Sequence, residues 1–337
     1  MRCGRPPKHR QHRLKGAVRN VAWLVALGAP FWLGACAASK VQEPAVANHF
    51  ALTPDQTEVG AVGVYVTRKD DTLLDVARRF DLGYTQLMTA NPGVDEWQPG
   101  VGRRIALPGL YILPEGPRRG IVINLAQNRL YYFPPGGGMV ETYPIGVGVQ
   151  GRATPLGTTR VVAKRTHPRW VVPASIRREK PELPAVVPPG PDNPLGNYAF
   201  ELGWPSYLIH GTNKPDGIGR NVSHGCIQLY PEDVERLFGE VAIGTPVRVV
   251  NEGAQTAWIN GDLYIAVYPT KEQEDQIDVD EKMTPILSPH LKQRVAAAAG
   301  NRAADIDWEI VERADRDRSG VPVRVTFKGA PPAMALR

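Results

Sequence analysis

The spacing of apolar residues in the first half of the chain predicts a small domain of two strands and two helices. Apolar residues recur at helical spacing in two short stretches, and a strand-like run flanks each stretch. The predicted elements are a strand at 65–67, helices at 73–80 and 84–90, and a strand at 103–108. Asp71 and Thr72 are typical of a helix N-cap, and Asn91-Pro92-Gly93 ends the second helix. We therefore expect a βααβ domain over residues 63–109.

From residue 118 onward the pattern changes to strands. Runs rich in β-branched and aromatic residues alternate with short polar turns. The predicted strands lie at 121–125, 130–133, 140–148, 158–164 and 245–250, with one helix at 231–238. This pattern predicts a mainly β domain over residues 118–251, built as a β-sandwich or a mixed sheet, with an additional strand within 252–270. The proline-rich segment 170–196 has no regular pattern, which predicts a lid beside a cleft.

The two ends of the chain fit neither domain. Residues 1–35 hold a basic stretch followed by the apolar run 21–28, which is too short for a comfortable membrane span and is typical of a signal peptide. Leu33-Gly34-Ala35-Cys36 resembles a bacterial lipobox, which implies lipidation of Cys36. The segment also fits ordinary cleavage or an uncleaved anchor. Residues 36–62 are small and polar and predict a flexible tether, and the charged residues 271–337 predict a solvated appendage of unknown function.

Charge and motifs exclude two classes of partner. The formal net charge is +6, but residues 1–35 hold seven Lys and Arg and no acid, which leaves −1 for the remaining residues. Nothing therefore indicates a nucleic-acid partner. No glycine-rich phosphate loop joins a predicted strand to a helix, so a nucleotide cofactor is not expected. We predict that the protein uses no cofactor and no metal.

The segment from His210 to Cys226 combines a histidine, a thiol and several glycines. The other two cysteines lie in or next to the leader, so Cys226 is an unpaired thiol and not part of a structural disulfide. An imidazole can remove the proton of a thiol and hold the thiolate as an ion pair, and His210 is the candidate base. Gly225 lets the backbone approach a substrate, so the N–H groups around it are candidate donors to an oxyanion.

Several residues near this segment are candidates for substrate contact. They are Trp170, Tyr198, Asn213, Arg220, Ser223 and His224. Arg220 is a candidate clamp for a substrate carboxylate, although a surface arginine is the commoner case, and either aromatic ring fits core packing equally well. The segment is also compatible with a structural histidine, an inert buried cysteine, or a zinc site of His210, His224 and Cys226, whose spacing matches no common zinc pattern.

Two blocks of this segment resemble the L,D-transpeptidase catalytic domain (YkuD or ErfK/YbiS type) of bacterial cell-wall enzymes. The blocks are His210-Gly211-Thr212-Asn213 and Ser223-His224-Gly225-Cys226-Ile227. The resemblance implies that Cys226 is the nucleophile, that His210 donates and accepts protons, and that the backbone carbonyl of Gly211 orients His210. It implies attack on a peptidoglycan stem tetrapeptide, release of the terminal D-amino acid and acyl transfer to an amine. One position departs, because the family usually has arginine where this chain has Gln228.

The βααβ segment resembles a LysM module, which implies binding of glycan that contains N-acetylglucosamine. The candidate glycan contacts are Asp71, Thr72, Asn91 and Pro92. Together these resemblances imply a periplasmic lipoprotein, anchored in the outer membrane, whose partners are stem peptides and glycan.

The acyl acceptor and the class of activity stay open at this point. A diaminopimelate amine would give a cross-link, a lysine of an outer-membrane lipoprotein would give a tether, and water would give an L,D-carboxypeptidase. A papain-like cysteine peptidase is disfavoured, because those chains place the cysteine before the histidine. A non-catalytic wall-binding lipoprotein that acts through the LysM-like segment is also compatible with the sequence.

Overall fold

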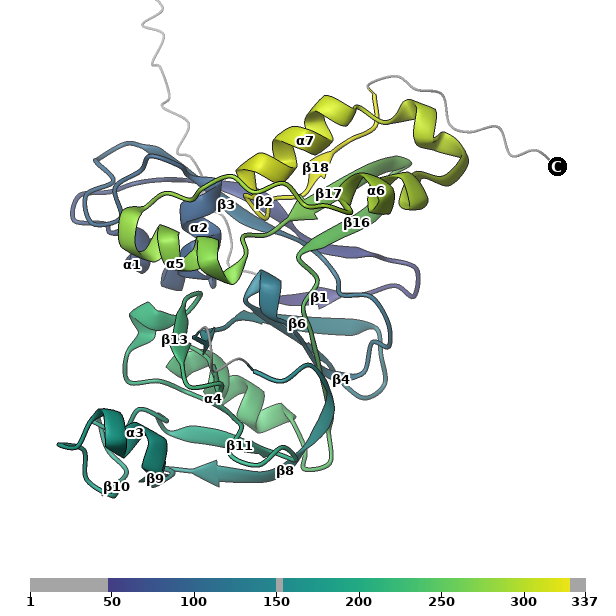
Figure 1. Ribbon diagram of the computed structural model, residues 1–337. Coiled ribbons are helices and arrows are strands. Elements are labelled where there is room, and N and C mark those ends of the chain that lie inside the picture. The colour runs from purple at the N-terminus through teal and green to yellow at the C-terminus, as the bar shows by residue number, and fades with distance from the viewer. Residues whose placement is uncertain (1–47, 150–153, 328–337) are drawn as a thin grey trace, which may run out of the picture. The chain divides into compact units, whose positions relative to one another are not determined.

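The computed structural model describes residues 48–149 and 154–327 of the chain (Figure 1). The leader predicted at 1–35 and the lipidation candidate Cys36 lie outside the described residues, so both stay predictions. Within the described part of the chain, no helix is both long enough and apolar enough to cross a membrane.

The centre of the fold is one mixed sheet of nine described strands that curls around a helix (Figure 1). In spatial order the strands are β1 (His49–Ala51), β6 (Met139–Pro144), β5 (Arg129–Phe133), β4 (Gly120–Asn124), β15 (Pro246–Val250), β8 (Gly157–Thr166), β11 (Tyr198–Leu202), β12 (Leu208–His210) and β14 (Ile227–Gln228). The pairs β4–β15 and β12–β14 are parallel, and the other neighbours are antiparallel. The helix is α4 (Pro231–Glu240), which buries Val234 and Leu237 because apolar residues three apart share one helix face. The prediction of a mainly β fold is confirmed, and its form is a mixed sheet.

Short elements border the curled sheet. Strand β7 (Val147–Gly148) pairs with β13 (Asn221–Ser223). Within the predicted lid at 170–196, β9 (Trp170–Val171) pairs with β10 (Val186–Val187), and helix α3 (Ala174–Glu179) lies between them. Single turns of 3₁₀-helix lie at Leu125–Gln127 and Pro215–Gly217. The segment predicted to be irregular therefore contains a small hairpin and a short helix.

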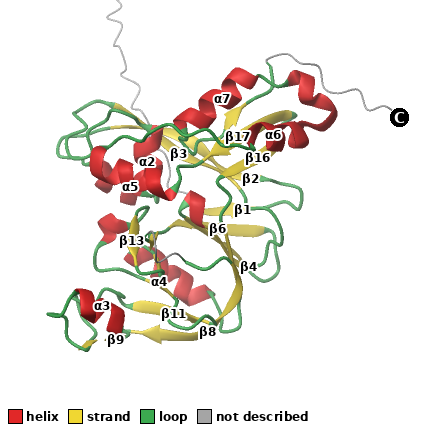
Figure 2. Ribbon diagram, viewed as in Figure 1, coloured by secondary structure: helices red, strands yellow, loops and turns green. Residues whose placement is uncertain are grey.

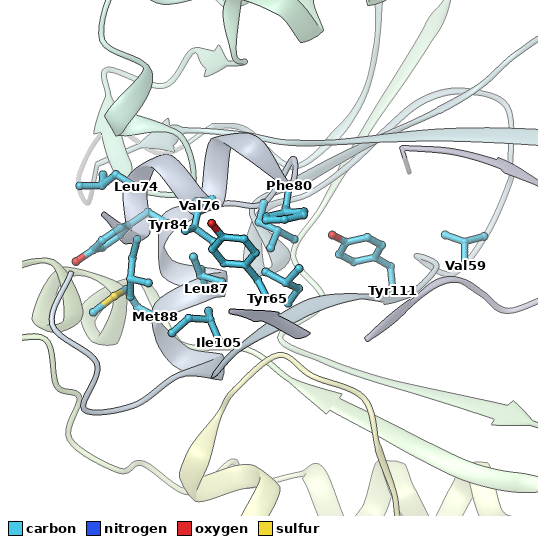
Figure 3. Close-up of a cluster of buried hydrophobic side chains, with 14 of the residues drawn as sticks. Val59, Tyr65, Leu74, Val76, Phe80, Tyr84, Leu87, Met88, Ile105 and Tyr111 are labelled. Atoms are coloured by element: carbon cyan, nitrogen blue, oxygen red, sulfur yellow. The ribbon is translucent and has the colours of Figure 1, made fainter. Parts of the chain in front are cut away.

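The predicted βααβ elements are present, with longer strands than expected. They are β2 (Glu58–Val66), α1 (Leu73–Arg79), α2 (Tyr84–Ala90) and β3 (Arg104–Ile112), and β2 pairs antiparallel with β3 along its whole length. The Thr72 hydroxyl accepts a hydrogen bond from the Asp75 N–H and caps α1 as expected. Side chains from all four elements form its core, among them Tyr65, Phe80, Leu87 and Ile105 (Figure 3).

The flexible tether predicted at 36–62 is wrong for part of its length. Strand β1 lies inside it and pairs with β6, and β2 begins at Glu58. A three-residue strand is too short to show a two-residue period. Gly60 and Gly63 also interrupt the alternation of β2. Both strands depend on partners distant in the sequence, which local patterning does not reveal.

Residues after 252 form a sheet of their own, in place of the added strand and solvated appendage predicted there (Figure 2). Its strands are β16 (Ala254–Ile259), β17 (Asp262–Val267) and β18 (Val323–Arg324), covered by α6 (Leu291–Ala299) and α7 (Trp308–Asp317), with 3₁₀-helix at Gly300–Asp305. Leu263, Val295, Val311 and Val325 belong to its separate core. The acidic run is helix α5 (Lys271–Asp280), capped by Thr270. The prediction failed because β18 has two residues and pairs far along the chain.

Candidate active site

Cys226 lies at the end of a tight loop between β13 and β14. The Ser223 hydroxyl donates to the Cys226 carbonyl oxygen at 2.5 Å and accepts the Gly225 N–H at 3.1 Å. Gly225 has φ = +104°, a backbone conformation that side chains with a Cβ disfavour. The Thr154 hydroxyl binds the Gly225 carbonyl oxygen at 2.9 Å. Ser223 and Gly225 therefore shape the loop that presents the thiol.

His210 ends β12 and lies on the neighbouring strand. The parallel register pairs Ile209 with Ile227 and His210 with Gln228. Extending this register by one residue sets Cys226 beside Leu208, two residues before His210. Residues two apart on a strand share a face, so the thiol and the imidazole lie on the same side of the sheet.

The His210 ring is buried and anchored by its own backbone neighbour. Only 3% of the residue is exposed, and Nδ1 lies 2.5 Å from the Gly211 carbonyl oxygen. Because a carbonyl accepts only, Nδ1 carries the proton and Nε2 is left as the basic nitrogen. This is the contact with Gly211 that the sequence led us to expect.

Burial favours the neutral form of both side chains. Burial lowers the pKa of His210 to about 4, against the opposing effect of the Gly211 carbonyl. Burial also raises the pKa of the Cys226 thiol, and a backbone hydrogen bond from Leu208 opposes that shift. The thiol donates to the Ser206 carbonyl oxygen at 3.7 Å. Both shifts favour the uncharged form in the resting site, a neutral thiol and a neutral imidazole.

The half-buried Cys226 opens onto a broad cleft, whereas His210 is not among the residues that line it. The walls come from the lid segment (Trp170, Val171, Ile176), the segment before and along β12 (Ser206, Tyr207, Leu208) and the loops around the thiol (Thr212, Asn213, His224, Gln228). Nε2 of His224 lies 3.5 Å from a Glu179 carboxylate oxygen, so an ion pair can link the thiol loop to α3 of the lid segment.

Two parts of the chain outside the catalytic sheet also line this cleft. They contribute Leu74 and Trp97 from the βααβ unit and Asp278 from α5. Trp97 is 59% exposed and lies in the loop between α2 and β3. Sequence reasoning missed these residues. The signal that could have found them was Trp97 itself, a large apolar side chain in a Gly- and Pro-rich loop that has no core to fill.

The comparisons with known proteins agree with this geometry. Residues 118–249 match the L,D-transpeptidase catalytic domain (YkuD). The chain is 40% identical over 293 residues to the probable L,D-transpeptidase YcfS of Escherichia coli K12, covering 84% of this chain and 89% of that protein. It is 41% identical over 256 residues to the probable L,D-transpeptidase YbiS of the same strain, covering 74% and 81%. The chain belongs to the L,D-transpeptidase family.

A third relative extends the similarity beyond the catalytic domain. The probable L,D-transpeptidase ErfK/SrfK of Escherichia coli K12 is 35% identical over 287 residues, which cover 82% of this chain and 90% of that protein. The match to the L,D-transpeptidase family therefore includes much of the chain outside residues 118–249.

The predicted substrate contacts of this L,D-transpeptidase separate into two groups. The cleft is lined by five of them, Trp170, Asn213, Arg220, Ser223 and His224. The Asn213 amide donates to the Pro191 carbonyl oxygen of the lid segment at 3.2 Å. Tyr198 does not line it. Its ring packs 4.8 Å from that of Phe238 and its hydroxyl donates to Glu235 at 3.1 Å. Tyr198 is therefore a packing residue, and its assignment to the substrate is wrong.

Arg220 is an internal brace of the transpeptidase. Its guanidinium lies 3.4 Å from the centroid of the Tyr84 ring, pairs with Glu96 at 3.3 Å and also pairs with Asp278. Arg220 also lines the cleft, but these two acids already neutralise it, so its role as a clamp for a substrate carboxylate stays a prediction. The arginine ties the loop before Cys226 to α2 and α5.

Gln228 stands where the resemblance led us to expect arginine. It lines the cleft, and its backbone exchanges two hydrogen bonds of 2.9 Å with Gly146. This backbone pairing holds β14 whatever the side chain is. Gln228 therefore places no positive charge at this point of the cleft.

The candidate glycan contacts are mostly used by the fold. Asp71 accepts from the Tyr65 hydroxyl at 2.6 Å and pairs with Arg79. The Asn91 side chain exchanges hydrogen bonds with the Ala106 backbone and donates to the Leu87 carbonyl. Thr72 caps α1. Asp71, Thr72 and Asn91 therefore hold the fold of the βααβ unit through these hydrogen bonds. Of the four candidates, Pro92 is the exposed residue without such a contact.

Proposed function

We propose that the protein is a cysteine-dependent peptidoglycan L,D-transpeptidase with Cys226 as nucleophile and His210 as general base and acid. The observation that supports this most directly is the β12–β14 register, which sets an anchored imidazole and a cleft-facing thiol on one face of the sheet. Family membership supports the reaction class, and the geometry supports the roles proposed for the two residues.

The neutral resting pair determines how the protons move. As Sγ attacks the carbonyl carbon of the stem peptide, the thiol proton passes to Nε2 of His210. When the C–N bond breaks, His210 returns that proton to the departing D-amino acid and a thioester remains. The acceptor amine then attacks the thioester, gives a proton to His210 and releases the thiol.

The oxyanion of each tetrahedral intermediate needs N–H donors in the loop around Cys226. The Gly225 N–H is directed to Ser223, so we assign the role to the amides of His224 and Cys226, for which no acceptor is recorded among the described residues. Donors of this kind contribute roughly 3 kcal/mol each in other acyl-transfer enzymes.

The βααβ unit is proposed as a LysM-type glycan-binding module at residues 63–109, placed before a catalytic domain at 118–251. Its four elements support the assignment, and Pro92 and Trp97 are among the exposed residues of its second loop. A glycan chain bound there would lie next to a stem peptide in the cleft, because Trp97 also lines the cleft. We further propose a signal peptide, lipidation at Cys36 and a periplasmic location at the outer membrane.

The test is incubation of the purified protein with tetrapeptide muropeptides. Wild type should release the terminal D-amino acid and gain the mass of a thioester at Cys226, whereas Cys226→Ala should do neither. Tyr198→Phe is the matched control, because this ring packs away from the cleft, and it should keep activity.

Three other outcomes would replace the proposal. Glycan binding without release would show a binding-only protein. Release without transfer to any added amine would show an L,D-carboxypeptidase. Cleavage of ordinary L–L peptide bonds would show a cysteine peptidase. Varying the acceptor between diaminopimelate and a lipoprotein lysine in the same assay identifies the biological product.

A further inference from the structure

Three potential metal ligands meet at the edge of the curled sheet, outside the cleft. They are His49 on β1, Glu141 on β6 and Glu240 at the end of α4, and one ligand atom from each lies within 4.8 Å of the others. His49 and Glu141 are direct cross-strand partners in the register of β1 and β6, which lie side by side (Figure 1). None of the three lines the cleft that holds Cys226.

The buried member of the group, Glu141, contacts both of the other two. Only 4% of Glu141 is exposed, and its Oε2 accepts from the Tyr143 hydroxyl at 2.5 Å. Its Oε1 faces His49 Nε2 at 3.6 Å, which is too long for a hydrogen bond, and its carboxyl group contacts that of Glu240. A carboxylate buried in this way needs a cation or a shared proton.

The second carboxylate increases that need. Glu240 lies against Glu141, so two carboxylates face each other at one point of the sheet edge. The nearby Arg236 donates its hydrogen bond to Asn48 at 2.9 Å. Two carboxylates and an imidazole nitrogen thus converge at one place.

We propose that His49, Glu141 and Glu240 bind a divalent transition-metal ion, best matched by zinc, that fastens β1 to the catalytic sheet. One nitrogen and two carboxylate oxygens suit zinc, while calcium and magnesium prefer oxygen ligands alone. His49 and Glu240 are exposed, which leaves room for water as the fourth ligand.

The position of the site explains what the ion would do. Strand β1 pairs with β6 through three residues at the edge of the sheet. A ligand that binds only the folded state adds RT ln(1 + [L]/Kd) to its stability. An ion held by β1, β6 and α4 therefore keeps the start of the described chain on the sheet. Because its ligands must be deprotonated, binding strengthens as pH rises.

The test titrates zinc chloride into Cys226→Ser protein, so that the active-site thiol does not contribute. Calorimetry should show one saturable site per chain, and zinc should raise the midpoint of thermal unfolding. Glu240→Gln and His49→Gln should each weaken binding by roughly tenfold or more. His290→Gln is the matched control, because this exposed imidazole bonds Gln293 elsewhere and should leave binding unchanged.

A second measurement separates loss of zinc binding from a change in stability that the substitution itself causes. In zinc-free buffer at pH 8, Glu240→Gln should unfold at a higher temperature than the reference, because it removes one of two adjacent carboxylates, yet it should no longer respond to zinc. The proposal is overturned if the reference binds no zinc, or if binding survives unchanged in both ligand variants.

Discussion

At the scale of single residues, burial and not charge pairing determines the protonation state of the proposed catalytic groups, His210 and Cys226. His210 is enclosed by the sheet and bound through Nδ1 to the Gly211 carbonyl, so protonation of Nε2 is costly. Cys226 lies in the same low-polarity environment and points its proton at Ser206.

This state predicts an unusual acid limit for activity. The transfer rate should stay level as pH falls from 7 to 5 and decline with a midpoint near 4, because the pKa of His210 is lowered to about 4. A histidine with an unperturbed pKa would give a midpoint of about 6.5. The measurement is the initial rate of D-amino acid release between pH 3.5 and 8, with circular dichroism as a check that the protein stays folded. A midpoint near that of free histidine would mean that the pair is exposed to solvent or ionised.

At the scale of elements, helix α2 and the loop before Cys226 hold each other. Gly83 offers α2 no side-chain cap, and the first N–H groups of the helix instead donate to loop carbonyls, Tyr84 to Ile218 at 3.0 Å and Thr85 to Gly219 at 3.3 Å. The Arg220 guanidinium covers the Tyr84 ring from the same loop. The βααβ unit thereby fixes a segment that leads directly into the nucleophile loop.

The contact predicts that Gly219→Ala damages both stability and activity. Gly219 has φ = +86°, and a Cβ there would lie 2.2 Å from the Tyr84 nitrogen, so α2 and the loop must separate. We expect a loss of about 2 kcal/mol or more in the free energy of unfolding by urea and a lower transfer rate. Gly239→Ala in α4 is the control, because nothing lies within 4 Å of its new Cβ, and it should stabilise by about 0.5–1 kcal/mol. If both variants had the same stability and the same transfer rate, the proposed contact between α2 and the loop before Cys226 would be contradicted.

The sequence predicts those elements and reactive residues that depend on neighbouring positions in the chain. Helix α2 is observed at the predicted residues 84–90, and the His210 and Cys226 blocks lie where their strands should bring them together. It does not predict what depends on distant partners. Strand β1 exists because β6 pairs with it, and Arg220 has its role because Tyr84, Glu96 and Asp278 come from three other segments. A single sequence records the charge of Arg220 but not the acids that neutralise it.

At the scale of the whole molecule, the βααβ unit and the catalytic sheet share one hydrophobic core. The cluster that contains Val59 and Tyr111 of the unit also contains Tyr131 and Phe133 of β5. Arg129 of β5 is only 1% exposed, stacks 3.9 Å from the Tyr111 ring centroid and donates to the Asp81 carbonyl oxygen at 3.1 Å. A binding module on a loose tether would show no such shared interior.

Arg129 also balances two buried acids that face each other across this core. Burial raises the pKa of both Asp81 and Asp233, and the positive charge of Arg129 opposes the shift in each. A carboxyl whose pKa is raised in the folded state lowers stability as pH rises through that pKa. The arginine is therefore needed most at neutral and higher pH, when a proton alone no longer neutralises the pair.

Arg129→Leu should consequently lower the stability of both regions together, by about 3–5 kcal/mol at pH 7, because it leaves the buried carboxyls without their cation. The deficit should shrink at pH 5, where the acids are more fully protonated. Hydrogen exchange followed by mass spectrometry checks this, since peptides from α2 and from β4–β5 should show the same opening free energy in wild type and fall together in the variant. If only the α2 peptides lose protection, the unit folds independently and its contact with the catalytic sheet is incidental. A joint loss means that the exposed Trp97 loop and the thiol are held by a single cooperative structure.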